Sequence, residues 1–247
     1  MNISEIAELF GIKITSAEKI KSGHINQTCL VTADNGERYI LQSINSQVFR
    51  RPETIMANIA LAEKAFSVSE TGMVKLPHYL TADDKNYAAA DGKIWRIYSF
   101  AESKSNEKNL YFTGLSFGTF IRLMSGVKLA EEPAIDNFHS YRTYLARLEK
   151  MTDSVEMVRY RKLGNLLESV FTDNACRRVI HGDAKTANVI IGDYCTIIDL
   201  DTIMPGLSLY DFGDSIRSSA VTVDETEKDL SIVDIDMELY ENYTKGF

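Results

Sequence analysis

The first hundred residues alternate apolar and polar positions in short runs, a pattern typical of strands in a half-buried sheet. The turn sequence Asp34-Asn35-Gly36 favours a hairpin between two of these runs, and Asp91-Gly92 favours another. A helical spacing of apolar residues follows Pro52, a residue that suits the first turn of a helix. The pattern therefore predicts a helix at 3–10, strands ending near residue 20 and at 28–32, 38–44, 78–81, 86–90 and 93–100, and one inserted helix at 52–67.

After residue 100 the period changes from that of strands to that of helices. The polar segment 101–109 is expected to link two lobes. Beyond it, the pattern predicts helices at 110–123, 141–148, 155–171, from about 211, and at 225–243, with short strands at 178–180, 189–191 and 196–200. We therefore predict an α+β, bilobal fold: an N-lobe sheet with one inserted helix (1–100), a linker (101–109), and a mainly helical C-lobe (110–247) that carries a small hairpin.

The composition narrows the function classes. The chain has 27 basic against 35 acidic residues, a net charge of −8, and this argues against a nucleic-acid partner. Cys29, Cys176 and Cys195 form no CxxC pair, so we expect free thiols in a reducing compartment rather than a disulfide frame or a zinc site. With no apolar run near about 18 residues and no basic stretch before Glu5 and Glu8, a membrane span and a signal peptide are not expected. A cytoplasmic protein is the default; the oligomeric state is not indicated.

The densest polar cluster lies between two apolar strands in the C-terminal half. It comprises His181-Gly182-Asp183, then Asn188 and, after a further strand, Asp199. Phosphoryl transfer needs these residue types, because an Asp accepts the proton of the attacking hydroxyl while Asn and Asp oxygens ligate Mg²⁺. The metal would also offset the phosphate charge, which allows an acidic chain to bind ATP. Asp183, at the apex of the loop, is the candidate base.

This spacing resembles the catalytic and metal loops of aminoglycoside phosphotransferase-like kinases, the small-molecule relatives of protein kinases. The string at 198–206, IDLDTIMPG, continued by YDFGD at 210–214, resembles the N-acetylhexosamine 1-kinase branch, as do the segments 22–28 and 39–45. The resemblance covers almost the whole chain in the family's order. It implies a protein-kinase-like fold, ATP as co-substrate, Mg²⁺ as cofactor, and the anomeric hydroxyl of an N-acetylhexosamine as acceptor.

Carried across by position, the resemblance implies that Asp183 is the catalytic base and that Asn188 and Asp199 are magnesium ligands. Asp201 would be an auxiliary metal ligand, or would support the metal ligands without touching the ion. Lys185 lies within the loop, where its ammonium group could touch the transferring phosphate, and a solvated loop lysine is an equal alternative.

Two further residues are expected to support the site. His181 would brace the catalytic loop as a buried histidine. Asp211-Phe212-Gly213 matches the metal-loop triplet of protein kinases, but it lies 23 residues beyond Asn188, whereas Asp199 lies 11 beyond. In the family that the chain resembles, an Asp near this place begins a helix and supports the catalytic loop, so we expect Asp211 to be structural.

The nucleotide would lie between the sheet and this loop. Its phosphates would be covered by backbone N–H groups of a loop with a single glycine, formed by Gly23, His24, Ile25 and Asn26. Gln42 takes the place of the third-strand lysine of protein kinases, so Mg²⁺, backbone amides, Arg38 or Lys185 would meet the phosphate charge. The hinge around Tyr98 and Phe100 would receive the adenine.

Several alternatives stay open. Relatives in this branch continue with further C-lobe helices, so the C-lobe is either cut short or part of a fragment. The acceptor could instead be an aminoglycoside, choline, a hydroxy amino acid or another sugar. Gln42 and the short C-lobe would suit a nucleotide-binding pseudokinase, which the intact catalytic set argues against. Asp214 and Arg217 would face the acceptor or pair with each other at i, i+3.

Overall fold

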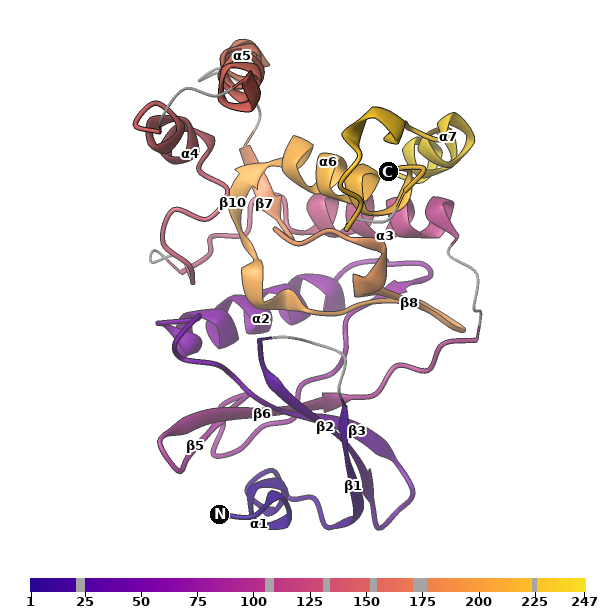
Figure 1. Cartoon of the computed structure of the whole chain (residues 1–247). Helices are drawn as coiled ribbons and strands as arrows, with labels where there is room; N and C mark the ends of the chain where they lie inside the picture. Colours follow the sequence, from indigo (N-terminus) through magenta and orange to yellow (C-terminus); the bar gives the residue numbers. More distant parts are fainter. Residues whose placement is uncertain (21–24, 105–108, 131–133, 152–154, 171–176, 224–225) are drawn as a thin grey trace.

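A five-stranded antiparallel sheet forms the N-terminal part of the molecule (Figure 1). The computed structural model describes residues 1–20, 25–104, 109–130, 134–151, 155–170, 177–223 and 226–247. Across the sheet the strands are β1 (Ile14–Ile20), β2 (Gln27–Ala33), β3 (Arg38–Ser43), β6 (Lys93–Ser99) and β5 (Ala88–Ala90). Helix α1 (Ile3–Glu8) packs on one face, where Ile6 and Phe10 meet Trp95 and Ile97 in a buried cluster.

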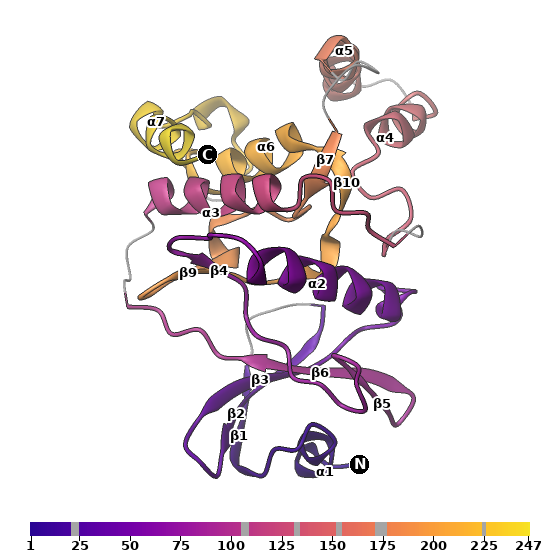
Figure 2. The same ribbon diagram turned by 180° about the vertical axis from the view of Figure 1, so that it is seen from behind.

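The inserted helix α2 (Pro52–Ser67) lies between this sheet and the helices of the C-terminal part, as Figures 1 and 2 show from opposite sides. Strand β4 (Val74–Lys75) follows it and pairs in parallel with β9 (Cys195–Ile197), which is far along the chain. The predicted strand at 78–81 is reduced to one bridge, between Tyr79 and Tyr98. Besides this bridge, the N–H of Leu80 donates to the carbonyl oxygen of Ile97, and the N–H of Ser99 donates to that of His78. These bonds to β6 do not form a regular ladder.

The C-terminal part contains the helices α3 (Leu110–Leu123), α4 (Tyr141–Leu148), α5 (Val155–Val170), α6 (Ser208–Ser219) and α7 (Met237–Gly246). Two small strand pairs lie among them: β7 (Arg177–Ile180) with β10 (Met204–Leu207), and β8 (Val189–Ile191) with β9. Short 3₁₀ turns are η1 (Thr186–Asn188), η2 (Leu200–Thr202) and η3 (Leu230–Ile232). Within the described residues no helix is long and apolar enough to cross a bilayer.

One buried apolar cluster crosses from the N-terminal to the C-terminal part. Ile55 and Ile59 of α2 belong to it together with Phe117 and Phe120 of α3 and Ile197 of β9. All five side chains are nearly or fully inaccessible to solvent. Burial of apolar surface is the main favourable contribution to folding, so α2 and α3 stabilise each other across the boundary between the parts.

The α+β class with an antiparallel N-terminal sheet and a helical C-terminal part is confirmed. The arrangement around the catalytic loop differs in detail from a hairpin, because β7 and β8 pair with β10 and β9 rather than with each other. The loop therefore bridges two small sheets. Of the three cysteines, Cys195 is buried and Cys29 half-buried, both as free thiols, and Cys176 lies outside the described residues.

Two of the predicted helix starts are wrong. The last helix begins at Met237 rather than near 225, because Asp236 caps it by accepting hydrogen bonds from the N–H groups of Glu238 and Leu239. Helix α6 begins at Ser208, three residues before the predicted start, which places Asp211 in its first turn rather than at its cap.

Candidate active site

A cavity of about 570 Å³ lies between the N-terminal sheet and the catalytic loop. It brings together most of the described residues that the sequence singled out for catalysis, metal or nucleotide, with Arg38 as the exception: Ile25, Asn26, Gln42, Tyr98, Phe100, Asp183, Lys185, Asn188, Asp199 and Asp201. These residues come from the segment before β2, from β3, from β6 and the residue that follows it, from the catalytic loop and from the segment after β9. Gly23 and His24 lie outside the described residues.

Asp183 is held from two sides. The amide nitrogen of Asn188 donates to its backbone oxygen at 2.8 Å and to its Oδ2 at 3.0 Å. The ammonium group of Lys185 lies 2.8 Å from the same Oδ2. Burial lowers the pKa of Lys185, but its hydrogen bond to Asp183 and the attraction of Asp183 and Asp199 outweigh that effect and raise it. One edge of the Asp183 carboxylate is therefore fixed, while the side chain remains 27% exposed to the cavity.

The buried carboxylate of Asp211 holds the catalytic loop in place through hydrogen bonds. Asp211 accepts hydrogen bonds from the backbone N–H groups of His181 at 2.7 Å and Gly182 at 2.9 Å. Burial raises the pKa of Asp211, although His181 and the two N–H groups act in the opposite direction. This geometry agrees with a supporting role for Asp211, away from the cavity.

His181 links the catalytic loop to the segment 198–202, the predicted metal loop. Its ring is fully buried, with the rings of Phe117 and Phe120 at 5.3 and 5.8 Å. The N–H of Asp183 lies 3.3 Å from its Nδ1, and the carbonyl oxygen of Ile198 lies 3.0 Å from its Nε2. Since Nδ1 accepts a hydrogen bond, Nε2 carries a proton and donates to the carbonyl oxygen of Ile198.

Asp199 lies two residues after β9, which ends at Ile197 rather than at the predicted residue 200, and it has an uncommon backbone conformation. Its φ of 60° and ψ of 55° are left-handed, which costs energy for a residue with a side chain. Burial raises the pKa of Asp199 to about 6, and repulsion from Asp201 and Asp183 adds to this effect while Arg96 and Lys185 oppose it. A strained, crowded carboxylate of this kind is a typical feature of a functional site.

The donors that face the cavity suit a hard divalent cation. The amide nitrogen of Asn188 is engaged by Asp183, so its carbonyl oxygen is the end that remains to ligate. Together with the Asp199 carboxylate it provides two oxygen ligands. Among the described residues no three His, Cys, Asp or Glu side chains cluster tightly enough to cage a metal. Mg²⁺ is commonly held by one or two protein oxygens plus phosphates and water, so this donor set fits it.

Asp201 lies beside Asp199 but is almost fully buried. Its Oδ1 forms an ion pair with Nη1 of Arg96 at 2.5 Å, and its Oδ2 accepts from the amide of Asn26 at 2.8 Å. Each oxygen therefore already accepts a hydrogen bond. Arg96 was not singled out from the sequence, because a lone basic residue in an apolar strand has no recognisable spacing; its only signal was a charge at a buried strand position.

One end of the cavity is apolar. Ile20, Ile40, Ile190 and Ile198 line it beside Phe100, the part where an adenine ring was expected. The N–H of Phe100 donates to the carbonyl oxygen of Arg38 at 3.1 Å, so this amide is used within the sheet. The Arg38 guanidinium lies 4.5 Å from the Phe100 ring and pairs with Glu102 at 3.0 Å. Arg38 does not line the cavity, which removes it as a phosphate-binding cation.

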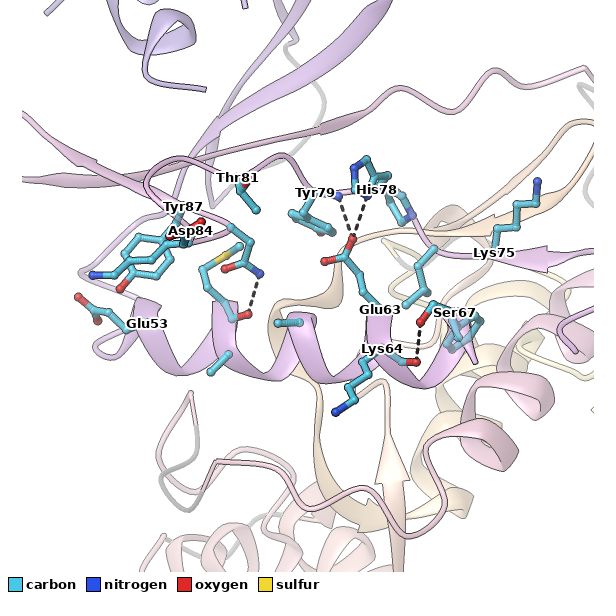
Figure 3. A pocket seen from close by; sticks show the side chains of 18 of the residues that line it. Glu53, Glu63, Lys64, Ser67, Lys75, His78, Tyr79, Thr81, Asp84 and Tyr87 are labelled. Atoms are coloured by element: carbon cyan, nitrogen blue, oxygen red, sulfur yellow. Dashed lines mark hydrogen bonds and ion pairs between the residues drawn. The ribbon is translucent and has the colours of Figure 1, made fainter. Parts of the chain in front are cut away.

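A larger hollow of about 850 Å³ lies on the other side of α2, between that helix and the segment 71–87 (Figure 3). There Glu63 accepts a hydrogen bond from the N–H of Tyr79 at 2.9 Å and lies 3.5 Å from Nδ1 of His78. None of the described residues with predicted chemistry lines it. Its size therefore does not make it the reaction site.

The model of the phosphotransferase enzyme family (APH) matches residues 16–230. An amicoumacin kinase in complex with AMP-PNP and Ca²⁺ is 16% identical over 93% of this chain and 71% of its own, with a TM-score of 0.63. A macrolide 2′-phosphotransferase from Brachybacterium faecium is 14% identical over 99% and 82%, with a TM-score of 0.62. A choline/ethanolamine kinase family protein from Mesorhizobium loti is 18% identical over 94% and 70%, at 0.56.

Proposed function

The chain belongs to the phosphotransferase enzyme family, and on that premise we propose that it transfers the γ-phosphoryl group of ATP to a hydroxyl group of a small molecule. The observation that carries the proposal is the shared cavity of about 570 Å³. Its apolar end has the character of a purine site, and its polar end holds Asp183, Asn188 and Asp199. Phosphoryl transfer depends mainly on positioning and on stabilising charge, which these groups can do.

Each residue has a role in this proposal. Asp183 accepts the proton of the attacking hydroxyl through its carboxylate, which Asn188 and Lys185 hold in place. Asn188 and Asp199 would hold Mg²⁺, which when bound neutralises charge on the phosphates. Lys185, whose ammonium group also lines the cavity, offsets negative charge near the transferred group. Gly23 and His24 remain predicted residues of the phosphate-binding loop. Tyr98 and Phe100 remain predicted neighbours of the adenine ring of ATP.

For the acceptor we propose the anomeric hydroxyl of an N-acetylhexosamine. The support is the resemblance of the 198–214 segment to that kinase branch. In the fold this segment runs from Asp199 through β10 into α6, next to the catalytic loop. Asp214 of α6 lies near enough to Lys185 to help raise the pKa of that lysine by charge attraction, and it pairs with Arg217 at 2.7 Å. This pair is a candidate contact for a polar acceptor.

The acceptor is identified by a product experiment. Protein, Mg·ATP and one acceptor at a time (N-acetylglucosamine, N-acetylgalactosamine, an aminoglycoside, choline, homoserine) would be followed by ³¹P NMR. A new resonance that couples to the anomeric proton, with the N-acetylhexosamines only, is the expected result. A product with another alcohol would keep the kinase and replace the acceptor. ATP binding without any product would support a pseudokinase.

A further inference from the structure

A buried cation lies behind the wall of the active-site cavity. Arg96 is on β6 and is 1% exposed, between Trp95 and Ile97, whose side chains pack on the opposite face of the sheet against α1. It does not line the cavity. A buried guanidinium is costly unless every part of it is paired, so its partners indicate what it is for.

The guanidinium group of Arg96 forms hydrogen bonds to two different elements. Its Nε and Nη2 donate to Oε1 of Gln42, at 2.9 and 2.5 Å, and Gln42 lies directly opposite it on the neighbouring strand β3. Its Nη1 pairs with Oδ1 of Asp201 at 2.5 Å, and Asp201 belongs to the turn η2 that follows Asp199. The planar guanidinium thus joins the sheet to the metal loop, a geometry that lysine cannot reproduce.

The partners extend this contact around the cavity. Nε2 of Gln42 donates to Oγ1 of Thr28 on β2 at 2.9 Å. The amide of Asn26 donates to the second oxygen of Asp201 at 2.8 Å, and its Oδ1 accepts from the N–H of Asn45 at 2.9 Å. Thr28, Gln42, Asn26 and Asp201 all line the cavity, whereas Arg96, which connects them, does not.

No acidic residue of α2 replaces this link. Glu53 and Glu63 both line the hollow on the far side of the helix, and Glu63 is engaged by the backbone of Tyr79. At the sheet position where protein kinases carry a lysine, Gln42 provides an uncharged oxygen that Arg96 uses. The cation that pairs with the acidic metal loop is therefore Arg96 on β6, rather than a lysine on the neighbouring strand β3.

We propose that Arg96 is a positioning residue, which holds Asp201 and thereby fixes Asp199 and the Asn26 end of the phosphate loop for the metal-bound nucleotide. The effect of Arg96 on catalysis rests on the proposed function, whereas its effect on the position of Asp201 does not. Asp199 is two residues from Asp201, in the left-handed conformation that begins η2. Since Asp201 binds both Arg96 and Asn26, loss of Arg96 releases the metal side and the phosphate side together. The apolar adenine end does not depend on it.

A purely structural ion pair would behave differently, and a double variant separates the two. Arg96→Gln leaves Asp201 buried without its cation and is expected to destabilise the protein. Arg96→Gln combined with Asp201→Asn leaves no unpaired charge, so most of the stability should return. Arg96→Lys keeps the charge but loses the fork. Lys93→Gln is the matched control, since Lys93 is an exposed cation on the same strand.

The readouts are thermal unfolding and the dissociation constant of AMP-PNP, measured with Mg²⁺ and again in EDTA. In the folded double variant the Kd of Mg·AMP-PNP should rise at least about tenfold, as for other residues that orient metal ligands. The Kd of AMP-PNP in EDTA should stay within about twofold of the wild-type value, because the adenine end of the cavity is untouched. Both dissociation constants of the Lys93→Gln control should also stay within about twofold, because Lys93 does not line the cavity. Wild-type affinity for Mg·AMP-PNP in the folded double variant or in Arg96→Lys would overturn the proposal.

A measurement on the wild-type protein does not depend on how the variants fold. Binding of Mg·AMP-PNP should slow amide hydrogen exchange in β6 around Arg96 as well as in the metal loop, and AMP-PNP in EDTA should not. Protection of the metal loop alone would contradict the proposal. If the wild type binds Mg·AMP-PNP in this way but phosphorylates no acceptor, the proposed function fails and the role of Arg96 stands; if it binds no nucleotide, both fail.

Discussion

Asp211 stabilises the catalytic loop, and a substitution can measure its contribution to the free energy of unfolding. It is buried and accepts two backbone hydrogen bonds from the catalytic loop. Asp211→Ala leaves the N–H groups of His181 and Gly182 unpaired, and should lower the free energy of unfolding by about 2–4 kcal/mol in urea denaturation. Asp214→Asn on the same helix removes only a partly exposed pair with Arg217, and should cost less than about 1 kcal/mol.

A metal ligand at Asp211 would give the reverse result. In that case Asp211→Ala would leave the urea midpoint unchanged and abolish metal-dependent nucleotide binding. The sequence triplet Asp-Phe-Gly alone could suggest that outcome, which is why the comparison with Asp214→Asn is informative.

Asp199 gives the metal-free protein a pH dependence. Burial and repulsion from Asp201 raise its pKa to about 6 in the folded protein, whereas in the unfolded chain an Asp titrates near about 3.9. Between these values the folded state binds a proton that the unfolded state has lost. The contribution of Asp199 to stability is therefore full below pH 4 and is lost as the pH rises to about 6.

The check is the free energy of unfolding of the metal-free protein between pH 4 and 6.5, for the wild type and for Asp199→Asn. The wild type should lose stability relative to the variant as the pH rises, since the variant has no proton to release. Parallel curves for the two proteins would show that Asp199 titrates normally.

Much of the site could be predicted because its residues are close in sequence. Asp183 and Asn188 are five apart, and Asp199 follows after one strand pair, so their spacing alone places them in one loop region. Arg96 could not be found in this way. It meets Asp201 across 105 residues, and only the fold brings the two together.

Helices and strands differ in how well the sequence indicates them, for the same reason. Helix hydrogen bonds are local, and the predicted bounds of α2, α3 and α4 agree with the structure. Strands β4 and β10 are two and four residues long and depend on distant partners, so no period reveals them. The start of α7 is set by its cap at Asp236, whereas the apolar pattern continues upstream of it.

Two glycines in helices are expected to respond to alanine in opposite directions. A Cβ at Gly114 of α3 would collide with the backbone of α7 at Tyr243, so the two helices are packed too closely for a side chain. Gly114→Ala should destabilise by about 1–3 kcal/mol. Gly213 of α6 has open space around it, and Gly213→Ala should stabilise by up to about 1 kcal/mol.

Thermal and urea unfolding of both variants would test this. The comparison is matched, because each change adds one methyl group inside a helix. A stable Gly114→Ala variant would mean that α7 does not pack against α3 as described. A loss of nucleotide binding in Gly213→Ala would implicate the Asp-Phe-Gly triplet in the site.

The N-terminal and C-terminal parts should unfold together. A single buried cluster joins α2 to α3 and β9, and β4 completes a sheet with β9 and β8. Trp95, the only tryptophan, is buried in the N-terminal sheet, while the helices of the C-terminal part contribute most of the far-ultraviolet circular dichroism. Urea transitions followed by the two signals should coincide. A tryptophan transition that precedes the loss of helix would show two independent units.

Phosphoryl transfer with Asp183 as base is tested most directly by ADP release from Mg·ATP with N-acetylglucosamine or N-acetylgalactosamine, for the wild type and for Asp183→Asn. The variant keeps the shape of the side chain but cannot accept the proton. ADP release that requires both sugar and Mg²⁺, and a kcat about 10²–10⁴-fold lower in Asp183→Asn with unchanged Mg·ATP binding, is the predicted result. A variant that turns over within a few-fold of the wild type would contradict it.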